Sequence, residues 1–178
     1  MPRGEKVIFF LRDPISRFVS AFQSRRREDK PRYFYPWTEG ERIAFEEFDT
    51  PNQLALALSS SDGMKKERAE AAMRNISHVK VSYWNWFQNE EYLKSRLSDL
   101  YFIGFQERLV DDFEILKSRI GLPESARLPD DDVLANKNPN DEHADLDDEA
   151  VANLQAWYED DFRLIALCRQ FVKSQDLL

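Results

Sequence analysis

Two stretches of the sequence are continuous hydrophobic runs that are rich in β-forming residues. Residues 7–11 read Val-Ile-Phe-Phe-Leu between charged neighbours, and residues 100–105 read Leu-Tyr-Phe-Ile-Gly-Phe. Runs of this length without polar alternation are typical of strands that are buried on both faces of a parallel sheet. The pattern therefore predicts two buried strands.

Most of the remaining chain has the spacing of amphipathic helices. Over residues 14–26 an apolar stripe recurs every three or four positions, Pro14 suits a first helical turn, and Asp13 suits the N-cap. The same criteria predict further helices over residues 40–48, 50–59, 64–76, 109–120 and 149–173. Residues 78–87 fit both a strand and a helix face, and we favour a helix there. Loops are expected over 28–37 and 123–148.

Strands separated by helices predict an α/β fold, and 178 residues suit a single domain over 1–178. Two strands make a small sheet for a domain of this length. We therefore expect either further strands that the pattern does not reveal or a part of the sheet outside these residues.

Composition excludes several classes of protein. The net charge of −8 disfavours nucleic-acid binding, which needs a basic surface. A single cysteine, Cys168, excludes an intramolecular disulfide and a cysteine-built zinc site. The aspartates of 130–148 miss the spacing of a calcium loop, so no metal is expected. No hydrophobic run approaches a membrane span and the first residues are unlike a signal peptide, so we expect a cytoplasmic protein.

The segment after the first strand carries the most informative chemistry. Arg12 follows the strand directly, at the end where open α/β sheets bind ligands, and the next helix starts there. Ser16 and Ser20 share a helix face, and Arg17 neighbours Ser20. A guanidinium and hydroxyls near a helix start predict a phosphate site. The alternative interpretation is a helix cap with a surface ion pair.

The pattern Arg-Asp-Pro-x-x-Arg-x-x-Ser-x-Phe, which begins at Arg12, resembles the 3′-phosphate-binding motif of sulfotransferases that use 3′-phosphoadenosine 5′-phosphosulfate. It is most similar to the carbohydrate-sulfotransferase-like branch, including its bacterial members. The resemblance implies that Arg12 and Ser20 bind the 3′-phosphate and that Arg17 is the second arginine of the motif. Later segments that also resemble the family are 101–109, Asp112-Phe113, Asn136-Lys137 and the Tyr-x-x-Asp-Phe pattern of 158–162.

The resemblance implies a three-layer parallel sheet of the P-loop nucleotide-binding kind and transfer of a sulfonate to a hydroxyl, on a carbohydrate acceptor. It adds Lys137 to the candidate donor-binding residues, among which Ser16 stands by its helix face, and it requires no metal. It assigns no catalytic base.

The sequence departs from the family at one point. Family members place a strand and a phosphate-binding loop tens of residues before the Arg-Asp-Pro motif. Here eleven residues precede Arg12, and none of the five glycines lies in a Gly-x-x-x-x-Gly-Lys loop. We therefore expect the first strand and this loop to be missing, and an open sheet edge that favours a homodimer. The alternative function is a non-catalytic remnant or a helical interaction domain.

Other residues have competing interpretations. The cations Arg25, Arg26 and Arg27 are expected to stabilise a helix C-terminus rather than to bind an anion. The loop aromatics Tyr33, Phe34, Tyr35 and Trp37 are expected to cover the core rather than to stack on a sugar or adenine. We expect His78 and His143 to be surface residues, and Glu107 to be a buried carboxylate paired with an arginine.

Overall fold

The structure, a computed structural model, describes residues 4–135 and 145–175. These residues form two compact units. The first unit comprises residues 4–13, 82–128 and 159–175, and the second comprises residues 14–81, 129–135 and 145–158. Each unit is described by itself below.

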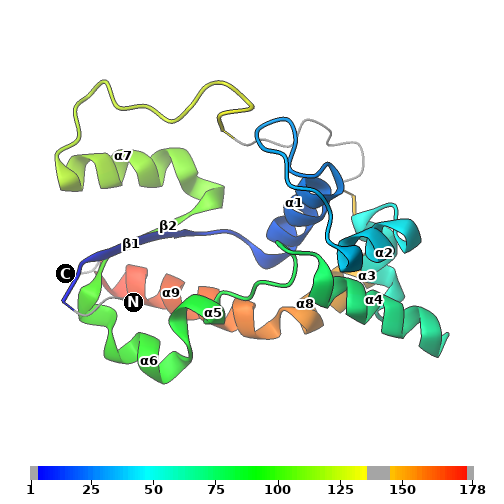
Figure 1. The fold of residues 1–178 in the computed structure, drawn as a ribbon. Helices are drawn as coiled ribbons and strands as arrows, with labels where there is room; N and C mark the ends of the chain where they lie inside the picture. Colours follow the sequence, from blue (N-terminus) through cyan, green and yellow to red (C-terminus); the bar gives the residue numbers. More distant parts are fainter. Residues whose placement is uncertain (1–3, 136–144, 176–178) are drawn as a thin grey trace. The chain divides into compact units, whose positions relative to one another are not determined.

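The first unit contains the sheet. Its elements are β1 (Val7–Leu11), α5 (Trp84–Phe87), α6 (Glu90–Ser95), η1 (Leu97–Asp99), β2 (Leu100–Phe105), η2 (Gln106–Arg108), α7 (Leu109–Ile120) and α9 (Glu159–Gln175). The strands pair in parallel, with Ile8 opposite Phe102 and Leu11 opposite Phe105. Helix α7 lies on one side of the strands and α9 on the other (Figure 1). Both predicted strands are confirmed.

The sheet is smaller and less buried than the sequence predicted. Over the described residues it has two strands, so this part of the chain is a helix-rich α/β protein with a small parallel sheet. Only Leu11 of β1 is buried, and Ile8 is 41% exposed. The expectation that β1 is buried on both faces was wrong. In the described residues β1 pairs with β2 alone, so its side chains have no neighbours from a second flanking strand.

A core of apolar side chains joins the strands to α9. Its buried members are Leu11, Tyr83, Phe87, Leu93, Leu100, Ile103, Phe105, Leu164, Ile165 and Cys168. Gly104 is required in β2, because a Cβ atom there would overlap the ring of Phe10 on the paired strand.

The second unit is helical. Its elements are α1 (Pro14–Arg26), α2 (Glu39–Glu47), α3 (Pro51–Ala57), α4 (Gly63–Asn75) and α8 (Asp148–Trp157). Phe18 and Phe22 of α1 are fully buried. Thr38, Thr50 and Asp62 cap α2, α3 and α4 with their side-chain oxygens, as the preference for these residues at helix starts leads one to expect.

Three details differ from the predicted helices. The last helix, predicted over 149–173, is two helices that break at Tyr158, the C-cap of α8; the Tyr158 hydroxyl donates to the Val79 carbonyl at 2.9 Å. Residues 78–87 are helical only over Trp84–Phe87, because the chain before α5 is held by hydrogen bonds to a side chain, described below. Helix α6, begun by an Asn89 cap, was not predicted.

Two other expectations stay predictions: a single domain over 1–178 and a homodimer. Across residues 4–135 and 145–175, no helix has both the length and the apolar character that a membrane span requires.

Candidate functional site

Arg12 is the first residue after β1, at the carboxyl end of the strand. The Tyr83 hydroxyl contacts both backbone polar groups of Arg12: it accepts from the Arg12 N–H at 3.0 Å and donates to the Arg12 carbonyl at 2.8 Å. The Tyr83 side chain belongs to the buried core of the unit. The backbone of Arg12 is therefore fixed by a side chain that is itself held by packing.

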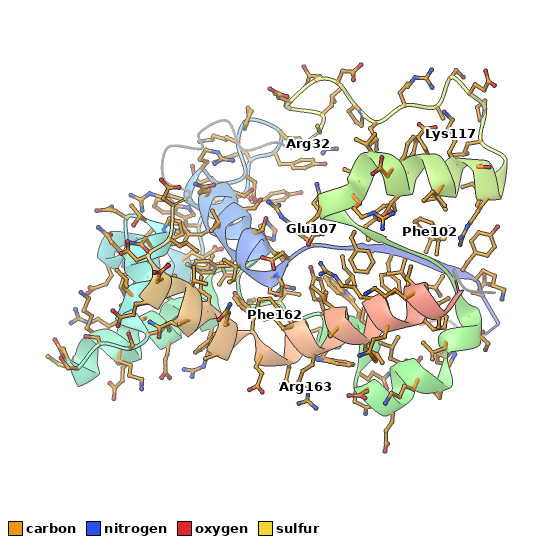
Figure 2. All side chains as sticks on the ribbon, turned by 180° about the vertical axis from the view of Figure 1, so that it is seen from behind. Arg32, Phe102, Glu107, Lys117, Phe162 and Arg163 are labelled. Carbon is orange, nitrogen blue, oxygen red and sulfur yellow. The ribbon has the colours of Figure 1, made fainter. Side chains whose placement is uncertain are left out.

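Asp161, in the first turn of α9, holds Tyr83 in turn. One carboxylate oxygen of Asp161 accepts from the Tyr83 N–H at 2.9 Å and from the Ser82 hydroxyl at 2.6 Å. The Trp84 indole N–H donates to the Asp160 carbonyl at 2.8 Å. Asp161 is 1% exposed. It directly precedes Phe162, which Figure 2 labels on α9. Residues 82–84 are thus fixed against the start of α9.

The carboxyl end of β2 lies at the same edge of the sheet, because the strands are parallel. The Phe105 N–H donates to Asp112 of α7 at 2.7 Å, and Asp112 also pairs with Arg108 at 3.3 Å. Glu107, just beyond β2 (Figure 2), pairs with Arg169 of α9 at 3.2 Å. The expected arginine partner of Glu107 is confirmed, but Glu107 is exposed rather than buried because it lies past the strand.

The charge of Arg12 is opposed by burial and supported by its neighbours. Burial lowers the pKa of the Arg12 guanidinium, while Tyr83, Asp13 and Glu107 act in the opposite direction. An arginine pKa is so far above neutrality that the side chain stays protonated. This edge of the sheet therefore carries a half-buried cation on a fixed backbone.

Three predicted residues lie on α1 of the second unit. Ser16 is exposed, whereas Arg17 and Ser20 are half-buried. The Arg17 guanidinium carbon lies 5.3 Å from the centroid of the Tyr158 ring, a cation–π contact. Ser16 and Ser20 share a helix face, as predicted.

The residues predicted to bind the phosphate fall in different units, so the site stays a prediction. Arg12 belongs to the first unit, and Ser16, Arg17 and Ser20 belong to the second. Lys137 lies outside the described residues, as does His143.

Arg25 of α1 is structural. Its guanidinium binds Glu41 of α2 through two hydrogen bonds of 2.7 and 2.8 Å and binds Asp29 at 2.6 Å. The side chains of all three residues are buried. Burial raises the pKa of Glu41, but hydrogen bonds from Arg25, Thr38 and Ser77 outweigh it and hold the pKa well below its ordinary range. Arg25 does lie in the last turn of α1, where a helix-terminus cation was expected, but its charge is neutralised by Glu41 and Asp29 inside the unit.

The next two arginines differ from Arg25. Arg26 donates to the Phe45 and Phe48 carbonyls at the end of α2, both at 3.2 Å, and so stabilises a different helix end from the one predicted. The Arg27 guanidinium donates to the Lys30 carbonyl at 3.2 Å. Burial lowers the pKa of Arg27, and Asp29 opposes that shift.

The buried Arg25–Glu41–Asp29 cluster lines a cleft of about 560 Å³. The cleft is lined by Ser24, Arg25, Asp29, Tyr33, Tyr35, Pro36, Thr38, Glu41, Ser77 and His78. Nε2 of His78 is 3.3 Å from an Asp29 oxygen, and His78 is largely exposed, as predicted.

The loop aromatics do not cover the core, with one exception. Tyr33, Phe34 and Tyr35 are 50%, 58% and 60% exposed. Trp37 alone packs inward: its ring centroid is 5.0 Å from that of Phe45, and its N–H donates to the Arg25 carbonyl at 2.6 Å. The expectation of a core-covering cluster was wrong for the other three, because hydrogen bonds to the loop backbone at Tyr35 and Pro36 position the segment without apolar burial.

The chain belongs to the Sulfotransferase family, whose sequence profile it matches over residues 5–165. No curated protein and no solved structure matches it. The small parallel sheet with its covering helices is consistent with a sulfotransferase fold, and the family indicates a transferase that uses a phosphoadenosine-type sulfate donor. Within the described residues, no group of three or more His, Cys, Asp or Glu side chains is arranged to bind a metal.

Sequence reasoning missed the residues that hold the sheet edge. Tyr83 lay in the segment of ambiguous periodicity and carried no distinguishing signal. Asp161 lay in the Tyr-x-x-Asp-Phe pattern, which marked the position without giving it a role. Asp112 likewise lay in a segment that resembles the family, which did not predict its contact with the Phe105 N–H.

Proposed function

We propose that this protein binds 3′-phosphoadenosine 5′-phosphosulfate and transfers its sulfonate to a hydroxyl of a carbohydrate. The observation that carries the proposal is the family membership over residues 5–165 together with the position of Arg12 between the end of β1 and the start of α1. A cation at the carboxyl edge of a parallel sheet, next to a helix start, suits a phosphate.

Arg12 and Ser20 are the proposed ligands of the 3′-phosphate. The guanidinium donates two parallel hydrogen bonds to phosphate oxygens, and the hydroxyl donates a third. Arg17, Ser16 and Lys137 complete the proposed donor-binding set. The observed state of Arg12 supports its role, since it is charged, half-buried and held at its backbone.

The reaction places defined demands on the site. A bond forms between the acceptor oxygen and the donor sulfur, the bond from sulfur to the bridging phosphate oxygen breaks, and the acceptor proton passes to a base. Charge builds up on the leaving phosphate and must be neutralised by donors placed beforehand.

The cleft above Arg25 supports a carbohydrate acceptor. Tyr33 and Tyr35 line it with exposed rings, whose apolar faces suit the C–H face of a sugar, while Ser24, Ser77 and His78 offer polar groups for hydroxyls. Small-molecule sites combine such apolar walls with a few fixed polar groups.

Binding of adenosine 3′,5′-bisphosphate, the product nucleotide, tests the proposal. At a concentration one hundredfold above the dissociation constant, the ligand stabilises the folded chain by about 2.7 kcal/mol, which a thermal shift assay detects. Arg12→Ala should reduce the shift strongly, whereas Arg163→Ala, which removes an exposed arginine of the same unit, should leave it unchanged. No shift for the unaltered chain at millimolar nucleotide contradicts the proposal.

The second candidate is a non-catalytic interaction domain. Within residues 1–178, no glycine belongs to a Gly-x-x-x-x-Gly-Lys loop. This candidate predicts no nucleotide-dependent shift. It also predicts self-association or binding to another protein, which analytical ultracentrifugation over a range of concentrations measures.

A further inference from the structure

We infer that Tyr83 and Asp161 form a bracket that positions Arg12 for the donor's 3′-phosphate. The inference rests on the proposed function, in which Arg12 binds that phosphate. Neither residue is assigned to touch the nucleotide; both are positioning residues that act through the Arg12 backbone.

The bracket is a continuous chain of hydrogen bonds from α9 to Arg12. Asp161 accepts from the Tyr83 N–H at 2.9 Å, and the Tyr83 hydroxyl meets the Arg12 N–H at 3.0 Å and the Arg12 carbonyl at 2.8 Å. The Ser82 hydroxyl gives Asp161 a second donor at 2.6 Å. Every step lies within the first unit, so the chain of contacts belongs to one compact body.

Burial makes the bracket rigid. Tyr83 is 5% exposed and Asp161 is 1% exposed, so neither side chain exchanges its partners for water easily. One hydroxyl satisfies both polar groups of a single peptide residue, which fixes the peptide planes on either side of the Arg12 Cα. The side chain that leaves this Cα is the one proposed to bind phosphate.

Position matters more for this arginine than for a surface cation. A guanidinium binds phosphate with two parallel hydrogen bonds, and that geometry is lost when the base of the long side chain rotates. A small misplacement of a binding group weakens the binding of its ligand strongly. The bracket also gives a physical role to Asp161, the aspartate of the family-like pattern.

The experiment compares two nucleotides that differ by the 3′-phosphate alone. Isothermal titration calorimetry gives the dissociation constants of adenosine 3′,5′-bisphosphate and adenosine 5′-monophosphate, and the ratio of the second constant to the first measures recognition of the 3′-phosphate. Tyr83→Phe keeps the ring and removes the hydroxyl. Tyr101→Phe is the matched control, because the exposed Tyr101 hydroxyl also donates to a backbone carbonyl, that of Arg119 at 2.9 Å. The titrations are carried out at a temperature at which circular dichroism shows that every variant is folded.

We expect Tyr83→Phe to lower the ratio about tenfold, as loss of one well-placed hydrogen bond does, and Tyr101→Phe to leave it unchanged. Asp161→Ala, as a second variant, should lower the ratio in the same direction. Arg12→Ala should lower it by about 10- to 100-fold.

Three results overturn the inference, and they are distinguishable. If Tyr83→Phe weakens both nucleotides equally, the tyrosine is merely structural. If Arg12→Ala lowers the ratio and neither bracket variant does, the bracket is wrong while the proposed function stands. If the unaltered chain does not prefer the bisphosphate, the proposed function fails and the inference fails with it.

Discussion

Asp161 in the first unit and Glu41 in the second are both buried carboxylates, yet they bind different partners. Asp161 accepts from a backbone N–H and a serine hydroxyl. Glu41 binds the Arg25 guanidinium through both oxygens and also accepts from the Thr38 and Ser77 N–H groups. One carboxylate therefore organises backbone, while the other neutralises an arginine inside the protein.

The difference separates two kinds of arginine that look alike in the sequence. Arg25 has 4% of its side chain exposed, and its charge is matched by Glu41 and Asp29. Arg12 is half-buried, and the Tyr83 hydroxyl forms hydrogen bonds with its backbone N–H and carbonyl. Arg25 is thus held by buried carboxylates, whereas the backbone of Arg12 is held by a tyrosine hydroxyl.

Removing the Glu41 carboxylate should have the largest effect on stability. Glu41→Ala leaves the Arg25 charge buried without its main partner, which costs about 3–5 kcal/mol of unfolding free energy. Urea unfolding followed by circular dichroism measures the loss. The control is Glu46→Ala on the same helix, which breaks an exposed pair with Arg42 and should change little. Equal losses in the two variants would show that burial of the pair does not matter.

Acid should destabilise the protein through the same carboxylate. The folded state holds the pKa of Glu41 below its ordinary value of 4.5, so the stability it contributes is present above that value and is lost as the pH falls below it. The urea concentration at the midpoint of unfolding, measured from pH 7 to pH 3, should fall steeply below about pH 4.5. Glu41→Gln should start lower and depend less on pH in this range. If the midpoints of the unaltered chain and of Glu41→Gln fall with pH in parallel, Glu41 is not the source of the acid sensitivity.

A smaller loss is expected when the Asp161 carboxylate is removed. Asp161→Ala leaves the buried Tyr83 N–H without its acceptor, at a cost of about 1–3 kcal/mol. Burial raises the pKa of the nearby Cys168 thiol to about 12, so the thiol reacts with alkylating reagents only when this core opens.

The rate of Cys168 labelling therefore measures the effect on the first unit directly. Asp161→Ala should accelerate labelling, and Asp161→Asn, which keeps an oxygen acceptor, should accelerate it less. Labelling that is equally slow in both variants would show that Asp161 does not stabilise this unit.

Periodicity predicted the local structure well where a segment packs mainly by its own hydrophobic pattern. Both strands and the helices α1 and α7 occur at the predicted residues, and Gly121 ends α7 in the left-handed conformation that glycine favours. The single helix over 149–173 was wrong: the chain leaves the helix at Tyr158, whose hydroxyl donates to the carbonyl of Val79, far away in the sequence.

The candidate site was predictable only in part, for a related reason. Arg12 was recognised because its place after a hydrophobic strand is a local feature of the sequence. The partners that fix it, Tyr83 and Asp161, are brought to it by the fold, and no spacing in the sequence relates them. Likewise, nothing local distinguishes the inward-packed Trp37 from the exposed Tyr35 two residues before it.

That last pair gives the smallest expected effect on stability. Tyr35 is 60% exposed, and its hydrogen bond with Arg25 uses the backbone carbonyl, so Tyr35→Ala should change the unfolding free energy by about 0.5 kcal/mol or less. Trp37→Ala, in contrast, removes a ring packed on Phe45 and the partner of the Arg25 carbonyl, and should cost distinctly more. Urea unfolding of the two variants side by side measures both effects.

Tyr35→Ala costs less stability than Trp37→Ala, but it should weaken sugar binding more. If the cleft takes a carbohydrate, Tyr35→Ala removes a stacking surface from a loop that remains folded, and saturation-transfer NMR with neutral and uronic-acid-containing disaccharides should lose signal. A surface aromatic that costs nothing to remove from the fold but weakens a ligand is placed for binding. If Tyr35→Ala leaves the signal intact, the exposed rings of this loop serve another purpose and the acceptor must bind elsewhere.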